Sequence, residues 1–337
     1  MKSKVFVAAA LAAGAIAAAG AAASSSGGSL TGAGSTWVAP LMSLWQGNYK
    51  TSSVNYNPIG SGGGIVAISN RQVDFGASDA PLTPAQFGSC RGCVQIPWTL
   101  GATSVPYHLN GAPYGLKITG PVLADIYLGK ITRWNDKRIQ KLNKFKLPAT
   151  KITPVFRSDG SGTTYNFTDY LSHVSRSFRS RVGTAVTVNF PAGIGAKGSS
   201  GVSAALSRTD GAITYVDFAY SKKSHFKFFK IQNRAGIFTL PGFTATKAAA
   251  AGVKKIPASN AISIVDPPKK QKLAYPICTF SYVILPKKTS KAADLKKFVT
   301  WTLTRGQIVS GARAFLYLPI PKVVQKKGMK TLASVHT

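Results

Sequence analysis

Apolar runs alternate with turns that carry glycine and proline along most of the chain. Short runs rich in branched and aromatic residues predict strands, and longer runs with apolar residues at helical spacing predict helices. The predicted strands span residues 53–59, 73–77, 98–109, 152–156 and 280–286. The predicted helices begin near Ala39 and otherwise span residues 64–71, 123–128, 136–142, 163–172 and 292–307. Because strands and helices alternate, the pattern predicts an α/β architecture with mostly parallel sheets.

The pattern is weakest over residues 245–272, which are rich in alanine, lysine and proline. A poorly packed helix or an excursion on the surface is expected there. The chain from about Ser24 onward has roughly 310 residues, which is enough for two domains of ordinary size.

The first residues have the pattern of a secretory leader. Lys2 and Lys4 precede an alanine-rich apolar run from Val5 to Ala23. This arrangement predicts a signal peptide over residues 1–23, and a membrane anchor is the alternative because the run is barely long enough to span a bilayer. No cysteine lies near the expected cleavage site, so no lipid anchor is expected, and no later segment is apolar enough to span a membrane. We therefore expect a soluble, exported chain, either periplasmic or extracellular.

The charge is strongly unbalanced. Lysine and arginine number 42 against ten acidic residues, all aspartate, and the formal net charge is +32. Such a balance invites a nucleic-acid interpretation, but the basic residues are scattered through apolar sequence and form no long basic arm. We expect no specific nucleic-acid partner, and instead a basic surface suited to an anionic wall, membrane or medium that also concentrates small anions.

The chain has three cysteines: Cys90, Cys93 and Cys278. In an exported chain Cys90 and Cys93 could close a small local disulfide. Free thiols or another pairing are the alternative, and a redox or zinc site is less favoured because no second cysteine pair completes four ligands. Cys278 is either buried or competes for one of the other two.

Four segments rich in glycine, serine and threonine lie where a strand passes into a helix. They span residues 31–37, 59–64, 76–80 and 157–163. Helix N-termini present unpaired N–H groups and a partial positive charge, glycines allow close approach, and hydroxyls add donors. Each segment alone is typical of a cap or turn. Together, with Arg157 in one of them, they predict a shared anion pocket.

These segments do not fit common enzyme templates. None carries the lysine of a phosphate-binding P-loop, and residues 32–34 lack the third glycine of a dinucleotide fingerprint. Residues 159–162 are not a Gly-x-Ser-x-Gly nucleophile turn. No metal-ligand cluster is evident, and the four histidines lie near no obvious nucleophile or acid. We therefore expect a binding protein with no catalytic residue, metal or cofactor.

The chain resembles the phosphate-specific substrate-binding proteins of bacterial phosphate ABC transporters, from about Leu30 to its C-terminal region. The resemblance is strongest over residues 30–82, 123–142 and 152–171, and Gly211-Ala212-Ile213 with Tyr215-Val216 also matches. It implies a two-lobed periplasmic-binding-protein fold of type II, with the ligand buried between lobes that close on it. The lobe boundaries implied are residues 24–105 plus 279–337 for lobe I and 106–278 for lobe II. The two crossing strands of the hinge are expected near residues 104–108 and 277–282.

The resemblance also implies the role of individual residues. Those expected to bind phosphate are Thr36, Trp37, Ser61, Asp79, Arg157, Ser161, Gly162 and Thr163. Trp37 stands where the family usually has phenylalanine, and its contribution is expected to be a backbone N–H. Asp159 is expected to orient Arg157 without touching the ligand.

Asp79 is the informative residue among these. A buried carboxylate repels an anion but accepts a hydrogen bond from a protonated phosphate oxygen. Sulfate carries no such proton near neutral pH, so Asp79 is expected to select against it. The alternative is that Asp79 only caps a helix that starts near Pro81.

The implied partner besides phosphate is a membrane ABC permease, and the chain is expected to act as a monomer. The alternative is an extracellular phosphate scavenger or sensor, or a basic surface adhesion protein, without a permease partner. The cysteine pair, the lack of glutamate and the large positive charge depart from the family pattern.

Overall fold

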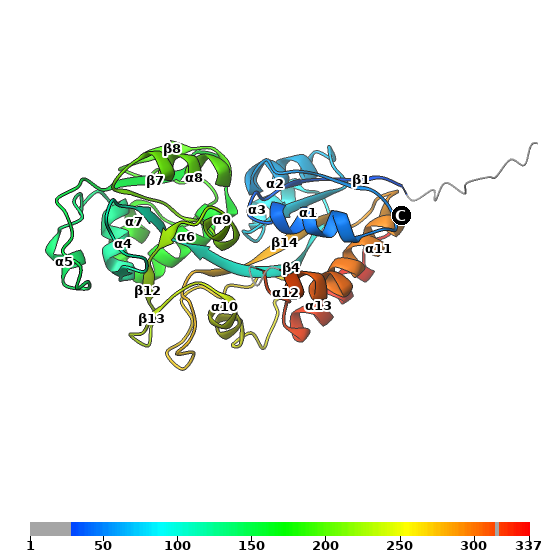
Figure 1. Cartoon of the computed structure of the whole chain (residues 1–337). Helices are drawn as coiled ribbons and strands as arrows, with labels where there is room; N and C mark the ends of the chain where they lie inside the picture. Colours follow the sequence, from blue (N-terminus) through cyan, green and yellow to red (C-terminus); the bar gives the residue numbers. More distant parts are fainter. Residues whose placement is uncertain (1–27, 314–316) are drawn as a thin grey trace, which may run out of the picture.

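The computed structural model describes residues 28–313 and 317–337. The predicted signal peptide, residues 1–23, lies outside the described residues. The chain forms two α/β lobes that lie side by side and are joined by extended strands (Figure 1). Within the described residues, no helix combines the length and the apolar character that a membrane crossing requires.

Lobe I is built on one mixed sheet. Its strands, in order across the sheet, are β10 (Val216–Asp217), β4 (Cys93–Ser104), β14 (Cys278–Pro286), β3 (Phe75–Ser78), β1 (Leu30–Gly34) and β2 (Val54–Asn57). The edge strand β10 comes from a segment of the chain that otherwise lies in lobe II. The helices of this lobe are α1 (Ala39–Asn48), α2 (Ser61–Ser69), α3 (Pro84–Ser89), α11 (Ala292–Leu303), α12 (Arg305–Arg313) and α13 (Lys322–Ala333). Buried aromatic rings fill the space between sheet and helices: Trp45 packs edge-on against Trp98 at 5.1 Å between ring centroids.

Lobe II has a second mixed sheet. Its strands, in order, are β11 (Lys227–Phe228), β5 (Pro106–His108), β9 (Ala212–Ile213), β7 (Thr153–Arg157) and β8 (Ile194–Ala196). Its helices are α4 (Gly120–Tyr127), α5 (Lys137–Gln140), α6 (Gly162–Val174), α7 (Arg176–Arg181), α8 (Gly198–Arg208) and α9 (Phe218–Lys223). A small sheet with β13 (Phe238–Thr239), β12 (Lys230–Gln232) and β6 (Lys117–Ile118), and helix α10 (Phe243–Ala250), complete the fold.

The α/β prediction is confirmed, but the expectation of mostly parallel sheets is wrong. Strand β1 is parallel to β2 and β3, whereas β14 is antiparallel to both β3 and β4. The physical reason is the connection between the lobes. Strand β4 carries the chain out of lobe I and continues after one residue as β5 of lobe II, and β14 carries it back (Figure 1). Two strands that cross the same junction in opposite directions pair antiparallel.

The helix predicted over 292–307 is split. Thr304 has φ −120° and ψ −91°, which no α-helical residue adopts, so α11 ends at Leu303 and α12 starts at Arg305. The weak segment 245–272 contains the end of α10 and then irregular chain. That irregular chain is anchored rather than loose, because Asn260 is buried and its Nδ2 donates to the carbonyl of Gln95 at 2.7 Å.

Cys90 and Cys93 form a disulfide with 5.5 Å between their Cα atoms. Arg71 holds this turn by donating to the carbonyl oxygens of Cys90 (2.9 Å) and Arg91 (3.1 Å). Cys278 is buried at the start of β14, and its thiol lies 3.3 Å from the carbonyl of Tyr275. It therefore does not compete for the Cys90–Cys93 pair.

Candidate functional site

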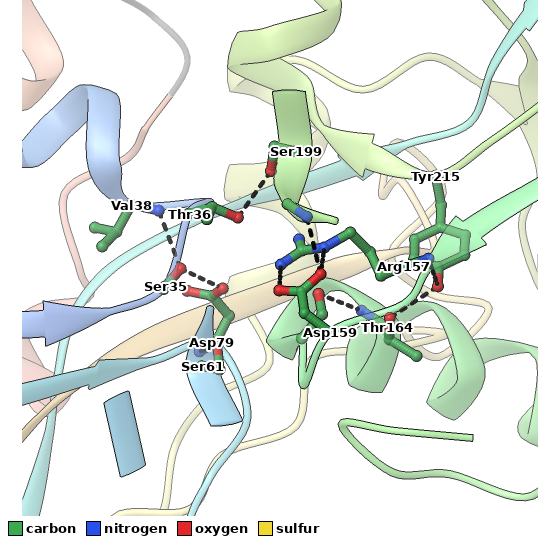
Figure 2. A network of polar contacts seen from close by, with 12 residues as sticks. Ser35, Thr36, Val38, Ser61, Asp79, Arg157, Asp159, Thr164, Ser199 and Tyr215 are labelled. Carbon is green, nitrogen blue, oxygen red and sulfur yellow. Dashed lines mark hydrogen bonds and ion pairs between the residues drawn. The ribbon is translucent and has the colours of Figure 1, made fainter. Parts of the chain in front are cut away.

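The segments that the sequence singled out converge on the junction between the lobes. Lobe I contributes the β1–α1 loop, the start of α2 and the residues after β3, and lobe II contributes the β7–α6 loop (Figure 2). The lobes touch there: the N–H of Gly62 donates to the carbonyl of Gly160 at 2.9 Å, and the hydroxyls of Thr36 and Ser199 lie 3.0 Å apart. The site is thus closed by contacts between residues about 100 or more positions apart in the sequence.

Glycine sets the path of the β1–α1 loop. Gly34 has φ +141°, and a Cβ at this position would lie 2.0 Å from the carbonyl oxygen of Ala77 on the neighbouring strand β3. This close approach turns the chain so that Ser35 and Thr36 point into the junction. The hydroxyl of Ser35 accepts from the N–H of Val38 (3.1 Å), which prepares the start of α1.

Asp79 lies at the centre of a set of hydroxyls. Its side chain is 1% exposed and accepts from Ser35 Oγ at 2.5 Å and from Ser281 Oγ at 2.7 Å, while its backbone N–H donates to Ser61 Oγ at 3.2 Å. Burial raises the pKa of this carboxyl to about 6, against the opposing effect of the serine hydroxyls and the charge of Arg157. The pKa of Asp79 therefore lies closer to neutral pH than that of an ordinary aspartate.

The alternative that Asp79 merely caps a helix is wrong. Helix α3 begins at Pro84, and Thr83 is its N-cap, with a reciprocal hydrogen bond between Thr83 and Gln86. The Asp79 carboxylate accepts no backbone N–H of that helix. Its oxygens face the serine hydroxyls at the junction instead.

Arg157 ends strand β7 and is the one cation that the sequence analysis placed in the site. Its side chain is 2% exposed and forms a two-pronged ion pair with Asp159: Nε to Oδ1 at 2.6 Å and Nη2 to Oδ2 at 2.5 Å. Asp159 also accepts from the N–H of Gly198 at 2.9 Å. Burial alone would raise the pKa of Asp159, but the hydrogen bonds and the charge of Arg157 hold this pKa below its ordinary value. Among the described residues, Nη1 of Arg157 has no partner.

The N-terminus of α6 faces the junction from lobe II. Ser161 is the N-cap and its hydroxyl accepts from the N–H of Thr164 at 3.2 Å. The hydroxyl of Thr163 is buried and has no hydrogen-bond partner among the described residues. A Cβ at Gly162 would lie 2.7 Å from the backbone N of Asp79, so only glycine lets the two lobes meet here. The helix start thus offers N–H donors, a free hydroxyl and a partial positive charge.

Trp37 is buried beneath the site rather than within it. Its ring packs edge-on against Tyr317 with 5.0 Å between centroids, and the Tyr317 hydroxyl donates to the Trp37 carbonyl at 2.7 Å. The side chain thus supports the β1–α1 loop from behind. This position fits the expectation that only the backbone of Trp37 acts on a ligand.

Sequence reasoning missed several polar residues that the structure brings to the site. They are Ser35, Ser199, Tyr215, Asp217 and Ser281. The run Gly198-Ser199-Ser200-Gly201 at the start of α8 has the same composition as the four predicted segments and could have been found by that signal. Ser281 lies inside a buried strand and Asp217 is the last residue of the two-residue strand β10, so no local pattern marks either residue.

Within the described residues, no group of three or more histidine, cysteine or acidic side chains could hold a metal ion. The arrangement instead offers one guanidinium, hydroxyl and N–H donors, and two buried carboxyls of raised pKa, Asp79 and Asp217. These groups can surround a small oxyanion.

Comparison with known proteins supports this interpretation. The PBP superfamily domain matches residues 19–305. Phosphate-binding protein PstS of Xylella fastidiosa is 37% identical over 306 residues, covering 88% of this chain and 83% of the relative. Phosphate-binding protein PstS of Pasteurella multocida is 36% identical over 307 residues, covering 89% and 88%. A solved high-affinity periplasmic phosphate-binding protein (PfluDING) bound with phosphate has the same fold, with a TM-score of 0.70, 19% identity and coverage of 89% and 92%.

Proposed function

The chain belongs to the PstS family of phosphate-binding proteins in the PBP superfamily, and from this membership we propose that it captures inorganic phosphate between its lobes. It is a substrate-binding protein of phosphate transport and not an enzyme. The observation that carries the proposal is that an acidic and a basic side chain, both buried, lie in one closed site. The buried carboxyl Asp79, with its pKa raised to about 6, shares the site with the buried guanidinium of Arg157.

Arg157 would supply the charge-assisted bonds to phosphate. Its Nε and one proton of Nη2 are used by Asp159, which leaves Nη1 and the second Nη2 proton to donate. Asp159 would keep the guanidinium in one orientation, so that little side-chain entropy is lost on binding. The free hydroxyl of Thr163 and the N–H groups of Gly162 and Thr163 would donate from the start of α6.

Lobe I would donate through Thr36, the backbone of Trp37, and Ser61, while Ser161 would act from lobe II. Asp79 would accept a hydrogen bond from the protonated oxygen of phosphate. Its two oxygens already accept from Ser35 and Ser281, and a carboxylate has lone pairs left for one further donor. Because sulfate brings no proton near neutral pH, its charge would face the carboxylate unrelieved.

We propose lobe boundaries at residues 24–105 plus 279–337 for lobe I and 106–278 for lobe II. The passage of β4 into β5 near Val105 and the return through β14 support this division. Phosphate would enter while the lobes are apart, and contacts such as that between Gly62 and Gly160 would form as they close.

Membership of the family supports our proposals for the location and the membrane partner. Residues 1–23 would be removed as a signal peptide, and the remaining chain would act outside the cytoplasm as a monomer. It would deliver phosphate to an ABC permease in the membrane. The net charge of +32 favours one second candidate: a scavenger or sensor that is held at an anionic surface and has no permease partner.

Calorimetric titration of the purified chain with phosphate, sulfate, arsenate and a phosphate ester tests the binding function. We expect tight binding of phosphate and no binding of sulfate. The ester should not bind either, because glycines of the two lobes are in contact at the site and leave no room for its organic group. Failure to bind phosphate would overturn the proposal. Phosphate uptake by cells with the permease, measured with and without this chain, separates the transport role from the scavenger.

A further inference from the structure

A strongly basic segment forms the C-terminal part of lobe I, and the proposed phosphate site does not use its charge. Residues 287–337 contain eleven lysines and arginines and a single acidic residue, Asp294. Helix α11 lies at the end of lobe I that faces away from lobe II (Figure 1). Helix α13 packs against α11 and adds the exposed Lys322, Lys326 and Lys330. This basic segment therefore presents its charge at a distance from the junction between the lobes.

A cavity of about 480 Å³ opens to solvent beside α11. Three cations line it: Lys296 and Lys297 of α11, and Arg305 at the start of α12. The ion pairs among the described residues involve none of these three side chains. Asp294 lies in the first turn of α11 and does not line the cavity. The cavity thus has three positive charges that no described carboxylate neutralises by an ion pair.

The break in the helix at Thr304 shapes the cavity and brings hydroxyls to it. Because α11 ends at Leu303 and α12 starts at Arg305, the chain changes direction here, and Thr304 and Arg305 both line the cavity. Thr304 Oγ1 donates to the carbonyl of Thr300 at 2.7 Å, which leaves its lone pairs to accept. The hydroxyls of Thr51 and Thr300 also line the cavity and form no hydrogen bond with a described residue. These threonines can therefore bond the hydroxyl groups of a ligand.

Two aromatic rings complete the wall of the cavity. Tyr49 is 4% exposed and packs against the partly exposed Trp301, with 5.4 Å between ring centroids. The hydroxyl of Tyr49 is buried without a hydrogen-bond partner among the described residues, and such unsatisfied groups are uncommon in native structures. Tyrosine, tryptophan and arginine are the side chains enriched at the centres of binding surfaces. The rings thus add an apolar face to the charged and hydroxyl groups of the cavity.

We propose that this cavity binds an anionic polysaccharide, a linear polymer whose sugar units carry carboxylate groups. Separate cations along an open cavity match charges that repeat along a polymer, whereas a single small anion is held by converging buried donors. The threonine hydroxyls bond sugar hydroxyls, and Trp301 packs against the apolar face of a sugar ring. A lipid bilayer fits less well. Faces that insert into membranes project apolar side chains, and here both rings lie in the wall of a cavity.

Binding of a polymer at this cavity is compatible with phosphate capture and does not depend on it. The cavity lies on the part of lobe I that faces away from lobe II, and the phosphate site lies at the junction of the two lobes (Figure 1). A chain held by its α11 end therefore keeps the junction free to open and close. The cavity gives the unusual basic charge of the sequence a binding role outside the phosphate site.

Calorimetric titration with polygalacturonate at low ionic strength tests the site. The cavity variant carries the three substitutions Lys296→Gln, Lys297→Gln and Arg305→Gln. It should bind the polymer about tenfold more weakly than the parent, because three exposed ion pairs are lost. Its affinity should also depend less on the salt concentration, since fewer counterions are released. The same polygalacturonate affinity in the cavity variant and the parent would overturn the inference.

A matched control removes the same charge from another part of the surface. Lys141→Gln, Lys144→Gln and Lys146→Gln are substitutions of exposed lysines on lobe II, after α5. This control variant should keep the parent's affinity for polygalacturonate. Equal losses in the two variants would show that net charge alone attracts the polymer, and the cavity would then have no binding role.

Two further measurements separate this inference from its alternatives. Flotation with phosphatidylglycerol vesicles should show no binding that depends on the cavity. Cavity-dependent binding to the vesicles, without binding to polygalacturonate, would assign the site to a membrane and overturn the inference. Phosphate titration should give parent-like affinity in both variants, which also shows that they fold. Failure of the parent to bind phosphate would defeat the proposed function and leave the polysaccharide site intact.

Discussion

Arg157, the last residue of strand β7, and Asp159, two residues later, are joined by two hydrogen bonds of 2.6 and 2.5 Å. Both side chains are buried or nearly so, with 2% and 12% exposed. A guanidinium fixed in this way presents its remaining donors in one direction, which is the arrangement that recognises a planar edge of an oxyanion. The ion pair thus mainly fixes the orientation of the Arg157 guanidinium, and it adds little net charge to the site because Asp159 offsets the charge of Arg157.

Replacing Arg157 should remove most of the binding. Arg157→Met loses charge-assisted hydrogen bonds worth about 1.5–3 kcal/mol each and leaves Asp159 unpaired beside the anion. We expect at least a roughly 100-fold loss of phosphate affinity in calorimetry. Arg138→Met is the matched control because Arg138 also pairs with aspartates, Asp125 and Asp136, but on the exposed surface of lobe II. Parent-like affinity in Arg157→Met would contradict the assigned role.

Replacing Asp79 should change selectivity more than phosphate affinity. Asp79→Asn removes the charge that repels a fully ionised anion, while an amide can still interact with the hydroxyls of Ser35 and Ser281. The ratio of phosphate to sulfate affinity should fall by at least about tenfold, because the repulsion at 3–4 Å amounts to roughly 4–5 kcal/mol at an effective dielectric near 20. Equal ratios in variant and parent, from paired titrations at pH 7, would refute selection by this carboxylate.

Gly162 should tolerate no side chain if closure is needed for tight binding. The added methyl of Gly162→Ala would lie 2.7 Å from Asp79 and Ser61 of the other lobe, so the lobes could not meet as they do. We expect a large loss of phosphate affinity and a larger radius of gyration by small-angle scattering with phosphate present. Gly88→Ala is the control, since a Cβ there meets nothing within 4 Å. An unchanged radius and affinity in Gly162→Ala would show that closure does not depend on this contact.

The stability of the ligand-free protein should decrease as the pH rises from about 4 to about 7. The pKa values of Asp79 and Asp217 are raised to about 6 and about 7, so in this window the native state binds more protons than the unfolded state. The loss should be on the order of 2–5 kcal/mol in urea unfolding at constant ionic strength. Asp159, whose pKa is lowered, acts in the opposite sense and only at lower pH.

Variants check the source of this pH dependence. The double variant Asp79→Asn, Asp217→Asn should have a flatter stability profile between pH 4 and 7. A parent stability that rises over this interval would mean that the two carboxyls are not held neutral by burial.

Removing the Cys90–Cys93 disulfide should affect stability but not binding. A disulfide lowers the conformational entropy of the unfolded chain. For so short a loop this stabilises the folded state by about 2 kcal/mol. The double variant Cys90→Ser, Cys93→Ser should lose up to that amount in urea unfolding and keep its phosphate affinity. A reductant should cause the same loss of stability in the parent. It should also do so in Cys278→Ala, in which Cys90 and Cys93 are the two remaining cysteines. A drop in phosphate affinity would link this turn to the site.

Much of the site could be predicted from the sequence because its parts are local. Neighbouring residues suffice to explain three features: the positive φ of Gly34, the helix N-cap Ser161 and the ion pair of Arg157 with Asp159. They depend on backbone freedom, capping and short spacing in the sequence, respectively. The strands and helices around them were found for the same reason. The antiparallel course of β14 and the break in the helix at Thr304 could not be predicted, because no nearby residue in the sequence indicates them.

The sequence by itself determined where loops rich in glycine and hydroxyl side chains occur and that the fold is α/β, because strand periodicity and helix caps are properties of neighbouring residues. Only the tertiary structure decided which hydroxyls surround Asp79 and which face Thr36. Ser281 is 202 residues from Asp79, and Ser199 is 163 residues from Thr36. Ser281 meets Asp79 because β14 pairs with β3 in the sheet of lobe I, whereas Ser199 meets Thr36 because the two lobes touch at the junction. The same burial, which no local pattern encodes, raises the pKa values of Asp79 and Asp217.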